Sequence, residues 1–485
     1  MSSAGTAGNG DRRAPPAPPP LWRAALSTLG TRAALLPLAF AQGALLARGL
    51  GPEGLGGYSA ALVDMTLLVT VASLGLPGGL AVLCSEAHAQ AASASASTVA
   101  ARLRALRRLA LGHGLRALAV VLLLALGVIL LGRSLGGGLY ARLTAARSET
   151  VLLLILGGAA AQYLRDTHNA LLWGGQQFST QNRLNLGLTV GQLAVTAALW
   201  ALGRLTPTAA LALHASSQLA LALAYALGLR ERLRPAPPEP AALASEPAAL
   251  ASKPAALSSE QRRRLWQVSL RNFLHILPDW LLFRIDIYLI QELVSAAQQQ
   301  RDLGLYQAGV RIAELLLLVP STLNTVLFAK AAAREDVGRS ALASAKLGLV
   351  LGLCACAGMA LLGRPLIVIL FGARYGGSFA PCLLVLLGCT ALCFSGPLAG
   401  TLSGAGGYPR SVVFAQCTAL LVNVGANLLL LPRLGILGAA AASALAYATS
   451  AALIARAFAR RFDVPLAELV RPVSPLALLA SLRRA

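Results

Sequence analysis

One apolar run does most to limit what this chain can fold into. Residues 115–132 read LRALAVVLLLALGVILLG and carry a single charge, Arg116. A helix of that length crosses the hydrocarbon layer of a bilayer, which is about 30 Å thick. The rest of the chain is similar, since 56% of its 485 residues are hydrophobic and 12% are charged, whereas soluble domains carry about 25% charged residues. The sequence therefore predicts a polytopic membrane protein.

Apolar segments separated by polar or helix-breaking stretches predict an all-α fold with twelve transmembrane helices. We place these near residues 26–47, 54–84, 106–131, 149–172, 183–202, 207–229, 265–293, 303–329, 341–370, 379–403, 410–431 and 435–457. Residues 1–24 are polar and Pro-rich and predict a disordered tail. This tail lacks the apolar core and small-residue cleavage site of a signal peptide, so the first helix is expected to be an uncleaved anchor.

The net charge of +22 has a topological explanation. If both termini are cytoplasmic, 27 of the 41 Lys and Arg residues fall in cytoplasmic segments or toward the cytoplasmic ends of spans, nine fall outside or toward the outer ends, and five lie deeper within spans. An excess of cationic residues on the cytoplasmic side is typical of multi-pass proteins. We expect a cell-membrane protein with both termini in the cytoplasm, whose basic residues contact anionic lipid rather than nucleic acid.

The cysteines and histidines give no sign of a metal site or of a cofactor. The seven cysteines all fall in expected spans and form no C-x-x-C motif, and the five histidines are scattered. Zinc sites need clustered ligands at short spacings. We therefore expect the cysteines to be small packing residues, and we expect no metal and no cofactor.

A repeated segment divides the chain into two parts. Residues 239–260 read EPAALASEPAALASKPAALSSE, a seven-residue unit in three copies. Each copy contains a Pro, which blocks a continuous helix, so a flexible cytoplasmic linker is expected. The predicted division is a six-helix lobe at 25–230, a linker at 231–262, a second six-helix lobe at 263–459 and a cytoplasmic tail at 460–485.

The two parts also resemble each other. LGGYSA (55–60) opens the second expected span and LGLYQA (303–308) opens the eighth, while LLPL around Pro37 in the first span matches ILPD around Pro278 in the seventh. Two matches in the same order favour an internal duplication. Repeats with an even number of spans keep the same orientation, the parallel-repeat plan of many transporters, with a central site between the lobes.

The run LLFRIDIYLI places Arg284 and Asp286 inside the seventh expected span. A charged side chain that faces lipid near the bilayer centre costs about 2.5–3.5 kcal/mol, so such residues are expected to face a cavity or one another. At 100° per residue, His275, Asp279 and Asp286 share one face of this helix, and Arg284 points away. We therefore expect Asp286 to line the interior and Arg284 to pair with a neighbour.

Polar residues also line one face of several other expected spans. On the eighth, Arg311 and Glu314 are three residues apart, and we expect them to form an ion pair lining a central cavity. Further members of such faces are Gln307; Arg165, Asp166 and Asn169; Asn185 and Thr196; Gln416, Asn423 and Asn427; Ser443 and Tyr447. One polar face alone is explained by hydrogen bonds between helices. Several of them, together with interior charges, favour a water-filled cavity.

Five segments, in their order and spacing, resemble one family. They are LARGLGPEGLGGYSAALVDMTLLVTVASLGLPGGL (46–80), FRIDIYLI, DLGLYQAGVRIAELLLLVPSTLNTVLF (302–328), FGARYGGSF (371–379) and LLLLPRLGILGAAAASALAY (428–447). Over residues 24–460 the chain is similar to the polysaccharide (O-antigen type) flippase family of the multidrug/oligosaccharidyl-lipid/polysaccharide exporter superfamily. These motifs are not catalytic signatures, and they specify no substrate.

This resemblance implies that the helices form a V-shaped bundle of two lobes and that the protein is a transporter and not an enzyme. It also implies alternating access, in which a polyprenyl-pyrophosphate-linked sugar passes from the cytoplasmic to the outer leaflet, with other membrane proteins of polysaccharide assembly as further candidate partners. Guanidinium groups suit pyrophosphate oxygens. The substrate-binding candidates are Arg32, Arg165, Asp166, Asn169, Arg284, Arg311 and Glu314. The ion-coupling candidates are Asp286, Asp64, Asp279 and His275.

Asp286 leaves two interpretations open. Burial penalises the charged form of a carboxylate, so an aspartate in a cavity that opens to each side in turn could take up a proton or cation and release it on the other side. The plainer interpretation is that Asp286 neutralises an arginine on span one, two or eight.

Four other functions remain open from the sequence. A drug/cation antiporter or a peptidoglycan-precursor flippase of the same superfamily would have the same two-lobed fold. A membrane-embedded polysaccharide polymerase or ligase would need a long outer loop with acid, base or nucleophilic residues, and the outer loops expected here are short. A non-transporting assembly scaffold would not need charges inside its spans.

Overall fold

The computed structural model describes residues 21–89, 96–134, 148–175, 177–230, 257–295, 297–318, 338–406 and 410–471. Within these residues the regular structure is helical and contains no strand, so the predicted all-α class is confirmed. The elements are α1 (Leu21–Ser73), α2 (Leu76–Ala89), α3 (Ala96–Ser134), α5 (Glu149–Gly174), α6 (Phe178–Ala201), α7 (Pro207–Arg230), α8 (Ser259–Leu293), α9 (Gln299–Glu314), η3 (Leu315–Leu317), α11 (Gly338–Phe371), η4 (Ala373–Ser378), α12 (Phe379–Gly406), α13 (Arg410–Leu434), α14 (Ile436–Phe462) and α15 (Leu466–Val470).

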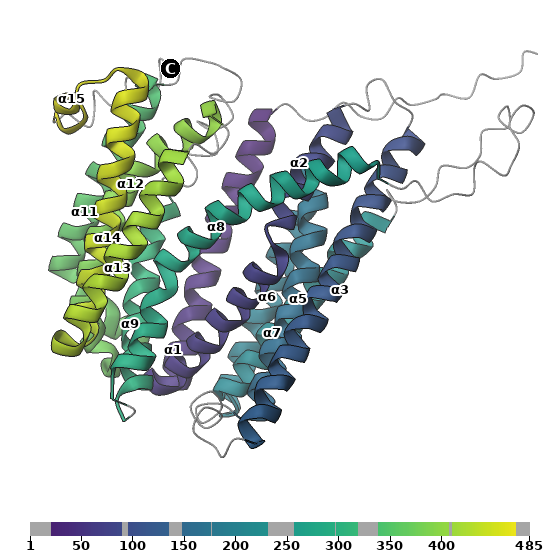
Figure 1. The fold of residues 1–485 in the computed structure, drawn as a ribbon. Coiled ribbons are helices and arrows are strands. Elements are labelled where there is room, and N and C mark those ends of the chain that lie inside the picture. The colour runs from purple at the N-terminus through teal and green to yellow at the C-terminus, as the bar shows by residue number, and fades with distance from the viewer. Residues whose placement is uncertain are drawn as a thin grey trace, which may run out of the picture.

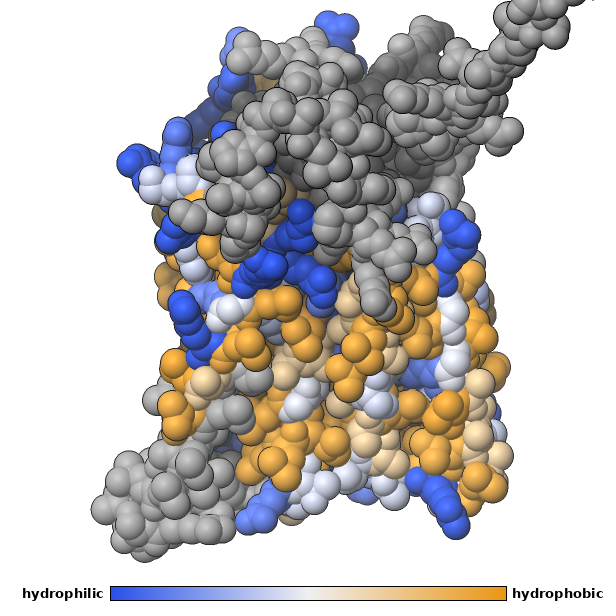
Figure 2. Space-filling model, turned by 90° about the vertical axis from the view of Figure 1, so that its right-hand side faces the viewer, coloured by the Kyte–Doolittle hydropathy of each residue, from blue (hydrophilic) through white to orange (hydrophobic). Residues whose placement is uncertain are grey.

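Seven helical segments in these ranges are long and apolar enough to cross a membrane. They are Leu35–Ser73, Phe178–Ala201, Pro207–Leu229, Gly338–Phe371, Ala373–Ser403, Arg410–Leu434 and Ile436–Phe462. Figure 2 shows a broad band of apolar side chains on one side of the molecule, with hydrophilic side chains gathered mainly above and below it. These features identify a multi-pass membrane protein.

The helix α1 bends sharply at one glycine. Gly51 has φ 68° and ψ 177°, a conformation outside the helical region, and Pro52 begins the second piece of the helix. A positive φ is accessible to glycine without the steric penalty that a side chain would bring, and Pro is favoured at a first helical position. The bend separates the first two expected spans.

The prediction of one continuous helix over residues 54–84 is wrong. Leu74 and Gly75 both have positive φ, 46° and 74°, and separate α1 from α2. A Cβ atom on Gly75 would lie 2.2 Å from the carbonyl oxygen of Ser269 on α8. The break therefore lets the backbone of this segment approach α8 closely, which a regular helix with a side chain there would prevent.

The helix α8 begins at Ser259, inside the segment expected to be linker. Its N-terminus has a capping box. The backbone N–H of Gln261 donates to the Ser258 hydroxyl at 3.1 Å, and the backbone N–H of Ser258 donates to the Gln261 Oε1 at 3.1 Å. This reciprocal pair satisfies two amides that a helix start would otherwise leave unpaired. Most of the expected linker, residues 231–256, lies outside the described residues, as do residues 135–147 and 319–337.

Two sets of helices lie side by side (Figure 1). The first set is α1, α2, α3, α5, α6 and α7, and the second set is α8, α9 and α11 to α14, with α1, α8 and α9 lying where the two sets face each other. The start of α1 and the end of α14 lie at the same end of the bundle. The sets meet mainly where α1 packs on α9 and where α2 packs on α8.

The contact between α1 and α9 is made by the two copies of the repeated motif. A Cβ atom on Gly56 would lie 1.9 Å from the Gln300 carbonyl oxygen, and one on Gly304 would lie 1.8 Å from the Pro52 carbonyl oxygen. Gly56 and Gly304 occupy the same place in LGGYSA and LGLYQA, and Pro52 and Gln300 each precede them by four residues. The two contacts are thus reciprocal, and each needs a residue without a side chain.

Candidate functional site

A buried polar cluster surrounds Asp286 on α8. Its Oδ1 accepts from the Asn427 Nδ2 at 2.7 Å, and its Oδ2 accepts from the Tyr306 hydroxyl at 2.6 Å and from the Ser443 hydroxyl. These partners lie on α13, α9 and α14 respectively. Asp286 is 1% exposed, so helices enclose it and it does not line an open cavity as expected.

The partners of Asp286 are neutral. Within the described part of the chain no Arg or Lys forms a salt bridge with this carboxylate, so the interpretation that Asp286 neutralises an arginine is wrong there. Asn423, one turn before Asn427, is also buried and donates to the Leu282 carbonyl oxygen at 3.3 Å, which fastens α13 to α8. Amides and hydroxyls can each turn an oxygen toward a cation or donate a hydrogen bond to a carboxylate. The arrangement can therefore hold either a charged carboxylate with a monovalent cation or a protonated one.

Two other ion-coupling candidates lie on the same side of α8. Asp279 accepts from the Gln416 Nε2 on α13 at 2.9 Å, and His275 lies one turn before Asp279. Asp279 and Asp286 both contact α13, as their shared helical phase predicts. That face packs on a neighbouring helix, and no group of three or more His, Cys, Asp or Glu able to hold a metal occurs among the described residues.

The partner of Glu314 is Arg284, and the expected pair of Arg311 with Glu314 is wrong. The Arg284 Nη1 lies 2.6 Å from the Glu314 Oε1, and its Nη2 lies 3.1 Å from Oε2. Glu314 is the last residue of α9, and η3 follows it. Its carboxylate meets the guanidinium of α8 in a two-point pair, which matches the fork of an arginine better than a neighbour on the same helix does.

Arg311 lies between α9 and α1. It donates to the Ser59 hydroxyl of α1 at 3.4 Å, and no carboxylate forms a salt bridge with it in the described ranges. One turn earlier, Gln307 is 6% exposed and its side-chain nitrogen has no hydrogen-bond partner. A guanidinium has five N–H donors. Most of those of Arg311 are therefore available to an anionic group that enters between α1 and α9.

A second polar group lies on α5 and α7, in the other set of helices. The Arg165 Nη2 and Nε lie 2.7 Å and 2.9 Å from the Asp166 Oδ1, and Nη1 donates to the Gln218 side chain on α7. Gln218 in turn contacts the His214 Nε2 at 2.9 Å. Asn169, one turn after Arg165, has a buried side-chain oxygen without a partner. Arg165 is thus neutralised by a carboxylate, unlike Arg311.

For two residues that the sequence analysis proposed as site residues, Arg32 and Asp64, the structure gives the helix on which they lie but no contact with the site. Arg32 lies on α1, but its side chain is outside what the structure describes. Asp64 lies on α1, five residues after Ser59, and is half-buried. Neither is brought into the Asp286 cluster by a described contact.

On α6, hydrogen bonds between helices explain two polar residues. The Tyr225 hydroxyl donates to the Asn185 Oδ1 at 2.8 Å, and the Gln42 Nε2 donates to the Thr196 hydroxyl at 2.8 Å. Sequence reasoning missed Tyr306 as a partner of Asp286. The sequence did mark Tyr306, as the tyrosine of LGLYQA (303–308). That motif was interpreted only as evidence of an internal duplication and not as part of a site.

Comparison with solved structures identifies the fold. A lipid II flippase MurJ in an inward closed conformation matches with a TM-score of 0.67 and 14% identity, over 96% of this chain and 92% of that one. A multidrug resistance MATE family transporter of the MOP superfamily, inward-facing, matches with a TM-score of 0.59 and 17% identity, over 89% and 96%. A MOP superfamily transporter from Pyrococcus furiosus matches with a TM-score of 0.54 and 17% identity, over 93% and 96%.

No protein-family model and no curated protein sequence matches the chain. At identities below a fifth, the structural matches establish the fold alone, which is that of MOP-superfamily transporters. This agrees with the superfamily that the sequence resembles.

Proposed function

We propose that the chain is a transporter that moves a lipid-linked oligosaccharide from the cytoplasmic to the outer leaflet by alternating access. The proposal includes twelve spans in two six-helix lobes related by a parallel repeat. It places the protein in the cell (cytoplasmic) membrane with both termini in the cytoplasm. The observation that carries it is Arg311, which lies between helices of the two sets and has no carboxylate partner among the residues that the structure describes.

The chemistry of the cargo fits Arg311. A polyprenyl-pyrophosphate-linked sugar has anionic oxygens that a planar guanidinium can bind at two points. Gln307 adds an unpartnered amide one turn away, and Ser59 adds a hydroxyl from α1. Because Arg284 and Arg165 are already paired with Glu314 and Asp166, we assign the cargo pyrophosphate to Arg311.

Contacts at the two ends of the bundle provide the elements that alternating access requires. At one end the Arg48 guanidinium donates to the Leu370 carbonyl oxygen at 2.9 Å and to that of Ile369, and the Tyr375 hydroxyl donates to the Ala47 carbonyl oxygen at 2.9 Å. In the proposed orientation this end faces outward. We propose that these contacts open to release cargo.

At the other end α2 packs on α8. The Arg264 Nη2 lies 2.7 Å from the Glu86 Oε1, and Leu76, Leu80 and Leu265 share one buried apolar cluster. Figure 1 shows α8 running from this contact across to the helices of the second set. We propose that this contact opens toward the cytoplasm to admit cargo while the contacts around Arg48 stay closed.

Asp286 is the proposed ion-coupling residue. Its neutral partners let it carry either a proton or a monovalent cation without losing a salt bridge, and its oxygens join four helices of one set. Binding and release of an ion there would change how α8, α9, α13 and α14 pack. Asp279, His275 and Asp64 remain secondary candidates.

A peptidoglycan-precursor flippase is the second candidate function. The match to a lipid II flippase MurJ, with a TM-score of 0.67 against 0.59 for the inward-facing MATE transporter, favours it over a drug/cation antiporter. Both flippases would use Arg311 in the same way, because both kinds of cargo join a sugar to a lipid through a pyrophosphate.

A null strain separates these functions. Lipid-linked oligosaccharide that accumulates on the cytoplasmic face supports the proposal, and accumulation of the peptidoglycan precursor supports the second candidate. Unchanged glycolipids with increased sensitivity to drugs would support the antiporter and contradict both.

Cysteine-accessibility labelling tests the orientation. A reagent confined to the outside should label single cysteines placed in residues 296–302 and leave those in residues 239–260 unlabelled. Labelling of the second group from outside would contradict cytoplasmic termini.

A further inference from the structure

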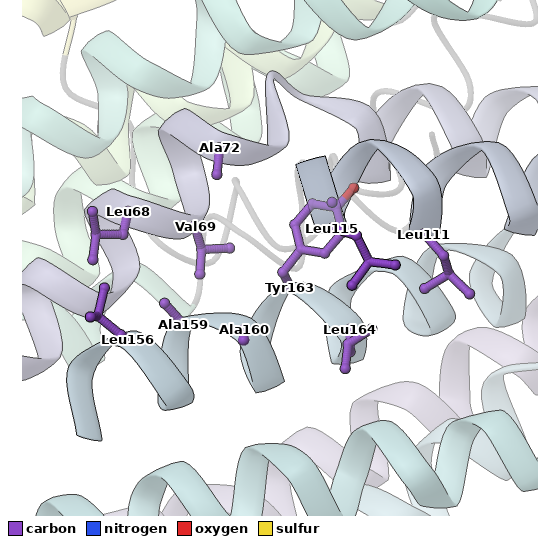
Figure 3. Close-up of a pocket in the computed structure, with 11 residues that line it drawn as sticks. Leu68, Val69, Ala72, Leu111, Leu115, Leu156, Ala159, Ala160, Tyr163 and Leu164 are labelled. Atoms are coloured by element: carbon purple, nitrogen blue, oxygen red, sulfur yellow. The ribbon is translucent and has the colours of Figure 1, made fainter. Parts of the chain in front are cut away.

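An apolar pocket lies between α1, α3 and α5, away from the Asp286 cluster. Figure 3 shows Leu68 and Val69 of α1 and Leu156 and Ala160 of α5 around it, with Leu111 and Leu115 of α3 toward one end. The space between these side chains is open at one side. Leu115 is 66% exposed, so the pocket reaches the apolar surface of the helix bundle.

The lining of this pocket offers nothing to a polar ligand. Its one polar side chain is Tyr163, whose hydroxyl already donates to the Ala110 carbonyl oxygen at 2.9 Å. The ring of Tyr163 packs closely on α3 at Gly114, where a side chain would not fit: a Cβ atom on Gly114 would lie 2.0 Å from the ring. A lining of this kind suits an apolar group, because a polar group entering it would lose hydrogen bonds to water.

A basic residue lies on the same face of α3 as the pocket. Arg108 precedes Leu111 by three residues and Leu115 by seven, so the three side chains fall within about 60° of one another at 100° per residue. Arg108 is exposed, and within the described residues it forms no salt bridge. At 1.5 Å per residue it stands about 5–10 Å along the helix from the pocket, which suits a lipid headgroup above its first methylenes.

We propose that this pocket binds an acyl chain of an anionic phospholipid of the cytoplasmic leaflet, with Arg108 at its headgroup. This rests on the proposed orientation, which puts the start of α3 at the cytoplasmic surface, and not on the identity of the cargo. Anionic lipids are concentrated in that leaflet, and each nearby Lys or Arg adds about 1 kcal/mol to their binding. The bound chain would fill the gap between α3 and its neighbours and hold α3 in place.

Native mass spectrometry of the purified full chain tests this with phosphatidylglycerol and phosphatidylcholine of matched chains. We expect one phosphatidylglycerol to bind saturably and in preference to phosphatidylcholine. Ala160→Phe, which puts a ring into the pocket, should abolish that binding, and the smaller Ala160→Leu should weaken it if the first variant does not fold. Ala360→Phe is the control, since Ala360 is exposed on α11.

Arg108→Gln should reduce the preference for phosphatidylglycerol about fivefold and leave phosphatidylcholine binding unchanged. Arg410→Gln, at the exposed start of α13, should not alter the preference. Equal binding by Ala160→Phe and the unchanged protein would overturn the proposal, as would equal affinity for the two lipids. Displacement of phosphatidylglycerol by a tighter-binding polyprenyl phosphate would identify the pocket as an isoprenoid site and also overturn it. Each result is independent of whether the null strain accumulates cargo.

Discussion

Asp286 and Arg311 lie on adjoining helices, and their surroundings are opposite. Asp286 is 1% exposed and both of its oxygens accept hydrogen bonds. All of its partners belong to α9, α13 and α14, which pack with α8. In the described part of the chain, Arg311 has one long hydrogen bond, to Ser59 on α1. One charge is enclosed within a set of helices, and the other stands where two sets meet.

This difference suggests two roles: Asp286 stabilises the packing within one set of helices, and Arg311 is placed to contact a solute between the two sets. Buried polar groups in folded proteins are nearly always paired, so the Asp286 cluster fixes the packing of its four helices. A charge inside a membrane protein that lacks a partner is costly and marks a pathway for solute. We therefore expect substitutions near Asp286 to affect coupling or folding, and substitutions of Arg311 to affect cargo.

Asp286→Asn should have the largest effect on transport. The amide keeps the shape of the carboxylate but removes the charge that an ion needs, so gradient-driven transport in proteoliposomes should fall to background while cargo still binds. Asp279→Asn, also on the α13 side of α8, is the matched control and should retain at least part of the activity. Normal gradient-dependent transport by Asp286→Asn would rule out a coupling role.

Arg311→Gln should weaken cargo binding strongly. Hydrogen bonds to a charged group contribute roughly 1.5–3 kcal/mol, so the dissociation constant for a polyprenyl pyrophosphate should rise about tenfold or more. Scintillation-proximity binding to the purified protein measures it, and thermal unfolding of the same sample should show no loss of stability. Arg165→Gln is the control, and an equal loss of affinity there would place the pyrophosphate elsewhere.

Glu314→Gln should reduce stability more than transport. It leaves the Arg284 guanidinium without its two-point partner, and breaking a buried pair costs about 3–5 kcal/mol, less where the pair is partly exposed. The unfolding temperature should fall, and the double variant with Arg284→Gln should recover part of it. If the single variant unfolds at the same temperature as the unchanged protein, the ion pair does not contribute to the stability of the fold.

Ser59→Ala should have the smallest effect. It removes one hydrogen bond to the Arg311 guanidinium, and because that bond is long, 3.4 Å, we expect it to contribute less than the roughly 1.5–3 kcal/mol of a well-formed bond to a charged group. Cargo affinity should change by less than tenfold, with the unfolding temperature unchanged. A loss as large as that of Arg311→Gln would mean that Ser59 itself holds the cargo or positions the arginine.

The sequence predicted the helical class and the two motif copies because both depend on local pattern. Apolar runs of sufficient length mark helices, and Gly56 and Gly304 sit in the copies that meet in the structure. The break at Leu74 and Gly75 was missed, because it depends on the approach of α8, which comes nearly 200 residues later in the chain.

Pairing of charges was predicted less well than their helical faces. Helical phase placed Asp279 and Asp286 on one side of α8, and both contact α13. It also suggested that Arg311 would pair with Glu314 three residues away. The structure joins Glu314 to Arg284 instead, because the ends of neighbouring helices bring groups together that sequence spacing along one helix does not reveal.

Translocation of a fluorescent polyprenyl-pyrophosphate-linked oligosaccharide in proteoliposomes tests the central claim most directly. With the purified protein, a membrane-impermeant quencher should reach cargo that began in the inner leaflet, and Arg311→Gln should slow this about tenfold or more. Arg165→Gln, reconstituted at the same density, should translocate at a rate close to that of the unchanged protein. If the unchanged protein moves cargo no faster than empty liposomes, or if Arg311→Gln moves it equally fast, the account is contradicted.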